Sequence, residues 1–346
     1  MALISKKKLT YPISPELRTY LRRYAVDVDL SIEYNDLTRY DNSIPLYDSH
    51  GNDTFWETVF YPQDEMKEVH HSLKDIYSKL KSGGDMREMK HLVVDRVDLC
   101  VYGNTQPFRI RMLNQINDNF DYFYVKHADA SRIYGLELEY LLSPNRISYF
   151  VHLDTIIEEH IIGIPGEQFI RTYLDDPNLN RIRVAKEFVK FNERCFVRLL
   201  GDMHSSNFVI NITPDFEEVD YRLRAIDFDQ QSYEGRKNIY QPKYYKQNNP
   251  IIELGLSMMT PETMRQYMRE ERSMIANRIK VDRDRVNDLL AAMKHEQIAP
   301  IENVMLLRKE LSEFYEEPAF ENCDSMGALV EQSLRMLLEK PDLYKD

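Results

Sequence analysis

Two stretches of sequence decide the expected fold of this 346-residue chain: Leu200-Gly-Asp-Met-His-Ser-Ser-Asn-Phe208 and Ala225-Ile-Asp-Phe-Asp229. In the first stretch, Asp202 is followed at short range by Asn207, and in the second stretch Asp227 ends an apolar run. Carboxylate and amide side chains are short and rich in oxygen, so these three residues are candidates for a polar site.

The segment between the two stretches predicts a β-hairpin. Residues 208–212 and 221–226 have the composition of short strands, and the polar residues 213–220 supply a turn between them. Such a hairpin would carry Asn207 at its start and Asp227 at its end. The alternative interpretation is a surface hairpin whose Asp and Asn side chains only shape turns.

Residues of these types in this order are typical of phosphoryl transfer. Asp202 is expected to accept the proton of an attacking hydroxyl, while Asn207 and Asp227 are expected to hold magnesium against nucleotide phosphates. Magnesium is a hard cation that prefers oxygen ligands of this kind. We therefore expect the chain to bind ATP and magnesium and to move the terminal phosphate.

The two motifs also carry a family resemblance. Gly-Asp-x-His-x-x-Asn followed by Ile-Asp-Phe-Asp resembles the catalytic loop and metal-binding strand of the aminoglycoside phosphotransferase-like branch of the protein-kinase-like fold. That branch includes kinases of choline, fructosamine and aminoglycosides. Its usual pattern has His before Gly-Asp, where this chain has Leu200, and the His-Arg-Asp and Ala-Pro-Glu signatures of eukaryotic protein kinases do not occur here.

The resemblance implies an α+β, bilobal fold, with a small antiparallel β lobe and a mainly helical large lobe. It implies an ATP-dependent phosphotransferase whose acceptor is a hydroxyl of a small molecule. It also implies that His204 braces the catalytic loop by hydrogen bonding. The expected domains are an extension over residues 1–90 that packs on the small lobe, a small lobe over 91–163, and a large lobe over 164–346.

Further nucleotide contacts are implied by the same resemblance. Lys126, at the end of an apolar strand over 120–126, matches the strand lysine that contacts phosphates; the alternative is a lysine that extends to solvent from a strand edge. A glutamate of the following helix, either Glu137 or Glu139, would pair with this lysine. A solvated glutamate is the alternative for each.

The adenine and phosphate contacts are expected at two other places. The segment after residue 155 resembles the connection between lobes, which assigns Glu159 and Ile161 to adenine and lets the chain turn at Gly163. Gly103, in the loop between the first two small-lobe strands, is the one glycine that could bring backbone N–H groups near phosphate.

Composition limits the classes of function. The formal net charge of −12 argues against a general nucleic-acid binder, which needs a basic face. No apolar run approaches the roughly 18 residues of a membrane span. Three widely separated cysteines suggest a reducing compartment and have no zinc-binding spacing. We therefore expect a cytoplasmic protein without nucleic-acid or membrane partners.

Two alternative functions remain. One is a nucleotide-binding pseudokinase or regulatory binding protein, which the leucine at position 200 and the glycine-poor loop leave open. The other is a protein kinase or nucleotidyl transferase on the same fold. The basic and aromatic segment 235–246 is interpreted either as a substrate-recognition loop or as a solvated connection. The sequence identifies neither the acceptor nor the oligomeric state.

Overall fold

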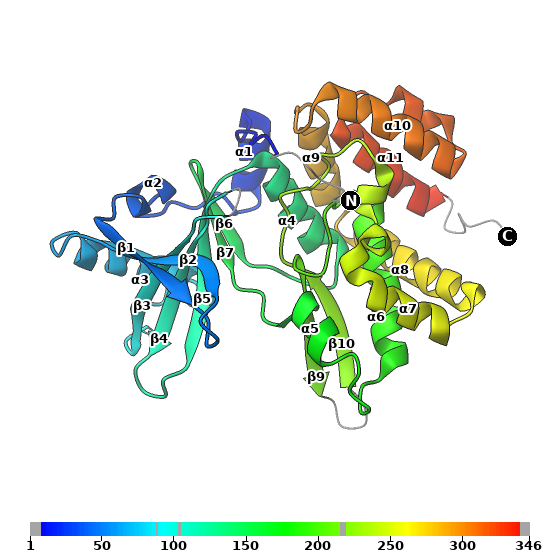
Figure 1. Ribbon diagram of the computed structural model, residues 1–346. Coiled ribbons are helices and arrows are strands. Elements are labelled where there is room, and N and C mark those ends of the chain that lie inside the picture. Colours follow the sequence, from blue (N-terminus) through cyan, green and yellow to red (C-terminus); the bar gives the residue numbers. More distant parts are fainter. Residues whose placement is uncertain (1–7, 88, 103–104, 215–218, 340–346) are drawn as a thin grey trace. The chain divides into compact units, whose positions relative to one another are not determined.

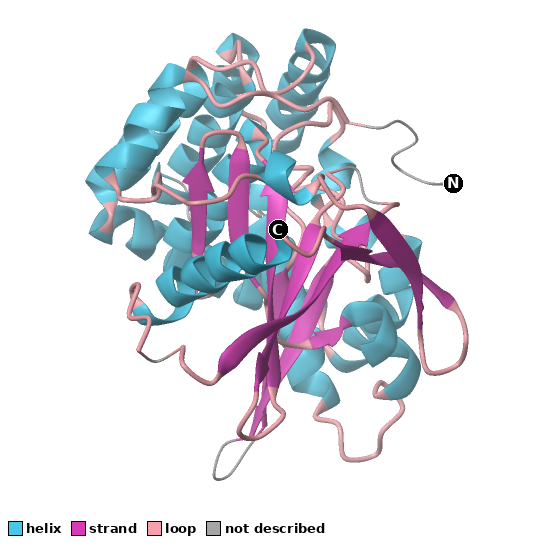
Figure 2. Cartoon of the chain, turned by 90° about the vertical axis from the view of Figure 1, so that its left-hand side faces the viewer, coloured by secondary structure: helices cyan, strands magenta, loops and turns pink. Residues whose placement is uncertain are grey.

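The computed structural model describes residues 8–87, 89–102, 105–214 and 219–339. The chain forms an α+β structure of helices and strands (Figure 2) and divides into two compact units. The sheet unit consists of residues Arg18–Asp129 and Ile147–His160, and the helical unit consists of residues Met1–Leu17, Ala130–Arg146 and Ile161–Asp346. Each unit is described by itself below.

A seven-stranded antiparallel sheet forms the frame of the sheet unit, with strand order β1-β2-β3-β4-β5-β7-β6 (Figure 1). Short connections join β1 to β2, β3 to β4, β4 to β5 and β6 to β7, and such connections favour antiparallel pairing. The strands are β1 (Asn42–Tyr47), β2 (Asp53–Phe60), β3 (Leu92–Cys100), β4 (Phe108–Asn114), β5 (Phe120–His127), β6 (Tyr149–His152) and β7 (Thr155–Glu159).

Helix α3 (Met66–Ser82) supplies much of the apolar core of the sheet unit. Its buried residues Val69, Leu73 and Ile76 recur at helical spacing and belong to one cluster with buried strand residues such as Phe108 and Phe123. The helix ends at a glycine in the left-handed conformation, Gly83, where the missing Cβ makes this backbone favourable. The unit also contains α2 (Tyr34–Leu37), and α1 (Pro15–Arg23) leads into it from the helical unit.

Part of the expected extension is built into the sheet. Strands β1 and β2 lie beside β3, and the guanidinium of Arg109 on β4 stacks 4.2 Å from the ring centre of Trp56 on β2. Such stacking of arginine on an aromatic face is favourable. The extension is also divided, because residues before Arg18 group with the helical unit. Strand β1 was not expected from the sequence, since its residues lack a regular alternation.

The helical unit contains most of the helices and a three-stranded sheet of order β10-β9-β8. Helix α4, which was expected in the small lobe, groups with this unit. The elements are α4 (Ala130–Leu142), β8 (Ile164–Pro165), α5 (Gly166–Thr172), α6 (Arg181–Val197), β9 (Phe208–Pro214), β10 (Val219–Ala225), η1 (Lys237–Tyr240), η2 (Pro242–Tyr244), η3 (Lys246–Asn248), α7 (Asn249–Met258), α8 (Pro261–Val281), α9 (Arg283–Lys294), α10 (Ile301–Tyr315), η4 (Pro318–Asn322) and α11 (Met326–Glu339).

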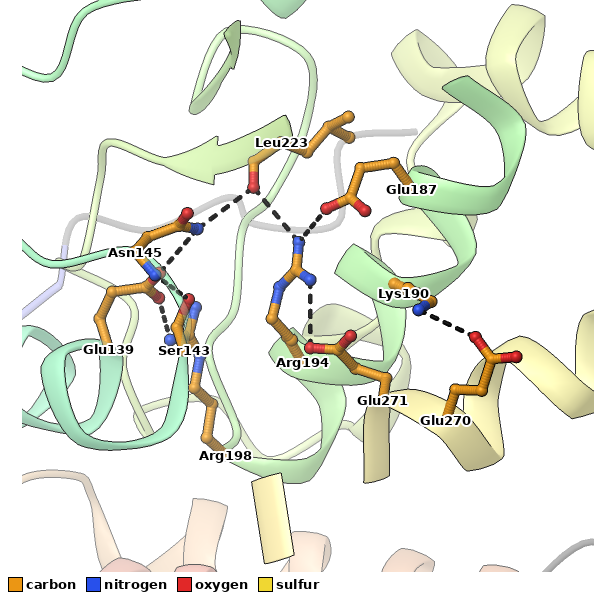
Figure 3. Close-up of polar contacts among 10 residues, drawn as sticks. All are labelled: Glu139, Ser143, Asn145, Glu187, Lys190, Arg194, Arg198, Leu223, Glu270 and Glu271. Atoms are coloured by element: carbon orange, nitrogen blue, oxygen red, sulfur yellow. Dashed lines mark hydrogen bonds and ion pairs between the residues drawn. The ribbon is translucent and has the colours of Figure 1, made fainter. Parts of the chain in front are cut away.

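Buried ion pairs connect three of these helices (Figure 3). Arg194 of α6 contacts Glu187 at 2.8 Å and Glu271 of α8 at 3.1 Å, and Arg198 pairs with Glu139 of α4. Arg194 is the central residue of the figure, and its guanidinium also donates to a backbone carbonyl of β10. Removing one partner of such a pair would leave a buried charge without compensation. The pairs therefore fix α4 against the helix that precedes the Leu200 motif.

None of the helices in the four described stretches is long and apolar enough to cross a membrane.

Candidate functional site

The loop after α6 adopts a constrained backbone that presents Asp202. Leu199 and Asp202 both have left-handed conformations, with φ of +56° and +60°. This region is unfavourable for a leucine, and it is more tolerable for an aspartate. Between them, a Cβ on Gly201 would lie 3.1 Å from the Gln230 carbonyl oxygen, so glycine lets the loop approach this neighbouring segment.

The hairpin expected from the sequence is present and joins the two motifs. Strands β9 and β10 pair antiparallel, with Phe208 opposite Ala225, and the Ile226 N–H donates to the Asn207 carbonyl at 3.0 Å. The Asn207 side-chain amide donates to the carbonyl oxygen of Asp202 at 2.8 Å. Since Asn207 uses its nitrogen in this bond, its orientation relative to Asp202 is fixed.

Residues of the segment 235–248 form hydrogen bonds to the loop that carries Asp202. The Asp202 N–H donates to the Tyr245 hydroxyl at 3.0 Å, and that hydroxyl donates to the Ile239 carbonyl at 2.9 Å. Asn248 donates to the Met203 carbonyl at 2.9 Å. Tyr245 and Asn248 are buried, so this part of the segment packs against the loop, whereas Lys243 remains exposed.

Several carboxylates lie near Asp202. Burial is the largest cause that raises the pKa of Asp202, and the charges of Asp227, Glu234 and Asp229 add to it in that order, so that this pKa is about 7. A carboxylate with a pKa near neutrality is suited to exchange a proton at physiological pH. The site therefore places one carboxylate with an altered pKa beside others that repel its charge.

His204 lies next to Asp202 without a direct hydrogen bond. Its Nδ1 accepts from the Ser206 N–H at 3.3 Å, and its Nε2 is 3.9 Å from Asp202 Oδ1. Burial lowers the pKa of His204, which favours the neutral ring. With Nδ1 as an acceptor, the neutral ring carries its proton on Nε2, toward Asp202. These contacts suit the expected role in bracing the loop.

Arg132 of α4 meets both carboxylates of the second motif. Its Nη1 lies 2.9 Å from Asp227 Oδ1 and 2.6 Å from Asp229 Oδ1, and its side chain is only 1% exposed. The Asp229 N–H also donates to Asp227 Oδ1 at 3.0 Å. A charged arginine thus offsets part of the negative charge that the carboxylates place at this site.

The site offers few side chains that could bind a magnesium ion. In the described parts of the chain, no group of three or more His, Cys, Asp or Glu side chains is arranged to hold a metal. Asp227 keeps 36% of its side-chain surface exposed, and Asn207 carries an amide oxygen. Magnesium is often held by one or two protein oxygens, with waters and substrate phosphates completing its shell. One carboxylate and one amide fit this pattern.

Lys126 is paired within the sheet unit. Its Nζ lies 2.9 Å from Glu158 Oε2, and both side chains are almost completely buried. In the helical unit, Glu137 pairs with Arg285 at 2.8 Å, and Glu139 pairs with Arg198. The sequence did not indicate these partners, and the expected pairing of Lys126 with Glu137 or Glu139 stays a prediction.

The residues assigned to adenine lie where the chain passes from one unit to the next. Glu159 ends β7, and its Oε1 accepts from the Ser148 N–H at 2.7 Å, while Ile161 is the first residue after the sheet unit. Gly163 does not adopt a left-handed conformation; a Cβ there would lie 2.7 Å from Val209 Cγ2. Close approach to β9 therefore explains this glycine better than a turn does. Gly103 lies outside the described residues.

Two residues of the site were missed in the sequence, Arg132 and Tyr245. Arg132 lies two helical turns before Glu139 on one face of a largely apolar helix, and a charged residue in such a segment is the signal that could have identified it. Tyr245 lies in the basic and aromatic segment 235–246, whose sequence did not indicate that this tyrosine contacts Asp202. No protein-family model matches the chain, and no curated protein sequence matches it.

Proposed function

We propose that this chain is an ATP-dependent phosphotransferase of the protein-kinase-like, bilobal type that transfers the terminal phosphate of ATP to a hydroxyl of a small molecule. In this proposal the sheet unit corresponds to the small lobe and the helical unit corresponds to the large lobe. Asp202 is the base, and Asn207 and Asp227 are the residues that would hold magnesium.

The observation that carries this proposal is the closure of the hairpin onto the loop. The bond from Ile226 N–H to the Asn207 carbonyl brings the ends of β9 and β10 together. The bond from the Asn207 amide to the Asp202 carbonyl then ties the candidate base to the same end of the hairpin. Three residues that are separated in sequence thereby form one local group, as the combined roles of base and metal ligand require.

The chain's own residues would act mainly by positioning. Asp202, fixed by the Tyr245 hydroxyl and by Asn207, would orient an acceptor hydroxyl and take its proton. A bound magnesium ion would supply charge stabilisation to the phosphates. In this proposal Lys126 keeps its expected role as the strand lysine that contacts the nucleotide phosphates. Phosphoryl transfer needs positioning and charge stabilisation more than covalent help, which is consistent with such a set of residues.

The experiment that tests the proposal separates binding from turnover. Thermal unfolding of the full chain is followed with ATP in the presence and absence of magnesium, and ADP formation is measured with a panel of hydroxyl compounds. We expect magnesium-dependent stabilisation by ATP and acceptor-dependent ADP formation. Stabilisation without ADP formation in any condition would favour a nucleotide-binding protein that lacks transfer activity.

Variants assign the activity to the site. Asp202→Asn is expected to lower turnover by roughly 10²–10⁴-fold while ATP binding is retained, since a positioned base contributes about this much. The matched control is Asp220→Asn, which changes an exposed aspartate on β10 of the same hairpin. Equal turnover in the two variants would remove Asp202 from the mechanism.

A further inference from the structure

Arg132 is a buried charge of the candidate site that the proposed phosphotransfer does not use. Its guanidinium lies between Asp227 and Asp229, with one nitrogen, Nη1, within 3 Å of an oxygen of each carboxylate. Arginine is not deprotonated in proteins, so this contact places a permanent positive charge between the two side chains.

The neighbours of Arg132 hold it in this position. The adjacent Ser131 hydroxyl donates to the Gln231 carbonyl at 2.6 Å. One turn later, a Cβ on Gly135 would lie 3.0 Å from Phe228 Cβ and 3.2 Å from Gln231 Cβ. The first half of α4 therefore packs closely on the segment 227–231, and the Arg132 side chain is buried there, with only 1% of its surface exposed.

The two carboxylates are placed differently around this charge. Asp227 Oδ1 accepts from both Arg132 and the Asp229 N–H, which fixes the rotation of its side chain. Its side chain is 36% exposed, whereas that of Asp229 is 16% exposed. Asp227 is therefore the more accessible carboxylate. A second divalent cation that bridged both residues would have to approach the guanidinium, and like charges repel.

We propose that Arg132 is the fixed cation of this site: it occupies the space between Asp227 and Asp229, orients Asp227, and limits the site to a single divalent ion. This inference rests on the proposed function, because it concerns the metal that would accompany ATP. Arg132 is in this view a positioning residue, and Asp229 is a partner of the arginine rather than a metal ligand.

Counting bound ions tests the inference. The full chain is titrated with Mn²⁺ in the presence of a non-hydrolysable ATP analogue. The signal of unbound Mn²⁺ in electron paramagnetic resonance gives the number of ions bound per chain, with the analogue alone as the blank. We expect one protein-dependent Mn²⁺ for the wild-type chain and two for Arg132→Met, which removes the charge but keeps much of the side-chain length. Arg132→Lys, which keeps a positive charge, is expected to bind one.

A second pair of variants tests the same assignment if Arg132→Met does not fold. Asp229→Asn is expected to retain one Mn²⁺ with less than a threefold change in affinity, whereas Asp227→Asn is expected to lose at least tenfold. Two ions on the wild-type chain, or equal losses in the two aspartate variants, would overturn the inference and leave the proposed function intact. A wild-type chain that binds no Mn²⁺ with the analogue would overturn the proposed function, and this inference with it.

Discussion

The ammonium of Lys126 lies 2.9 Å from a carboxylate oxygen of Glu158, and both side chains are almost excluded from solvent. Register explains how they meet. Glu158 of β7 lies opposite Tyr124 of β5, and Lys126 is two residues further along the same strand, so the pair is diagonal on one face of the sheet. The sheet unit thus contains a buried charge that has its own partner.

Breaking this pair should destabilise the chain. Glu158→Gln leaves the ammonium without its carboxylate, and we expect the free energy of unfolding to fall by about 3–5 kcal/mol, as for other buried pairs that lose one partner. The double variant Lys126→Met/Glu158→Leu should recover much of this loss, since neither charge remains. Chemical denaturation of the three chains checks the order of stability.

The control for that series is an exposed ion pair of the same unit. Lys79 and Asp75 pair at 3.1 Å one turn apart on α3, and both are partly exposed. Asp75→Asn should change the stability by less than about 0.5 kcal/mol. A similar effect of Asp75→Asn and Glu158→Gln would show that burial does not determine the strength of the Lys126 pair.

Removing one hydroxyl should weaken the support of Asp202. Tyr245→Phe deletes the hydroxyl that accepts from the Asp202 N–H. The Asp202 N–H then keeps only its second hydrogen bond, to the Ile239 carbonyl at 3.2 Å. We expect the stability to fall by about 0.5–1.5 kcal/mol. If the proposed function holds, turnover should fall more than ATP affinity does. The phenyl ring at position 245 still packs as before, and the orientation of the loop that carries Asp202 is the property that changes.

Tyr61→Phe is the control for Tyr245→Phe. The Tyr61 hydroxyl is also buried and donates to the Leu37 carbonyl at 2.9 Å, but it lies in the sheet unit. Its loss should cost a similar amount of stability and leave the ratio of turnover to ATP affinity unchanged. An equal shift of that ratio in both variants would argue against a positioning role for Tyr245.

The altered pKa of Asp202 predicts a pH-dependent stability. In the folded chain this pKa is about 7, above the ordinary value of 3.8, so the folded state binds more protons between these pH values. The associated stability is fully present below pH 4 and is lost as the pH rises through 7. Asp202→Asn lacks this dependence, and its melting temperature should therefore exceed that of the wild-type chain most clearly above pH 7.

Thermal unfolding from pH 4 to pH 8, in buffer with a chelator and no nucleotide, measures this difference. The advantage of Asp202→Asn should shrink toward acidic pH, while the exposed Asp220→Asn should follow the wild-type chain throughout. A constant difference between Asp202→Asn and wild type across the range would contradict the raised pKa.

Two helical glycines should respond in opposite directions to alanine. A Cβ on Gly327 of α11 would lie 2.4 Å from the backbone of Met293 at the end of α9, and this backbone cannot move away easily. Gly327→Ala should destabilise the chain by about 1–3 kcal/mol, as overpacking does. At Gly255 of α7 the nearest atom is 3.5 Å away, so Gly255→Ala should stabilise by about 0.5–1 kcal/mol.

Denaturation of both glycine variants measures these effects. Because the substitution is the same in each, intrinsic helix propensity favours alanine equally, and only the neighbours differ. Stabilisation by Gly327→Ala would show that α9 and α11 are not packed as closely as this structure has them.

Local patterns in the sequence were sufficient for the elements that depend on near neighbours. The β9–β10 hairpin was predicted from two short apolar segments around a polar turn, and helix α3 likewise carries its own signals, an apolar repeat and a terminal glycine. The predicted hairpin also placed Asn207 and Asp227 at the same end of the two strands. Periodicity and turn chemistry act over a few residues, so a single sequence displays them directly.

Only the tertiary structure decided which distant charges meet. Arg132 contacts Asp227 across 95 residues of chain, Asp202 is supported by Tyr245, and Lys126 is paired with Glu158 on another strand. A charged side chain that becomes buried requires a partner of opposite charge. The sequence offers several carboxylates that could be this partner and does not identify which one is. The choice depends on how helices and strands pack, which is set by the shape of whole surfaces rather than by the residues beside each charge.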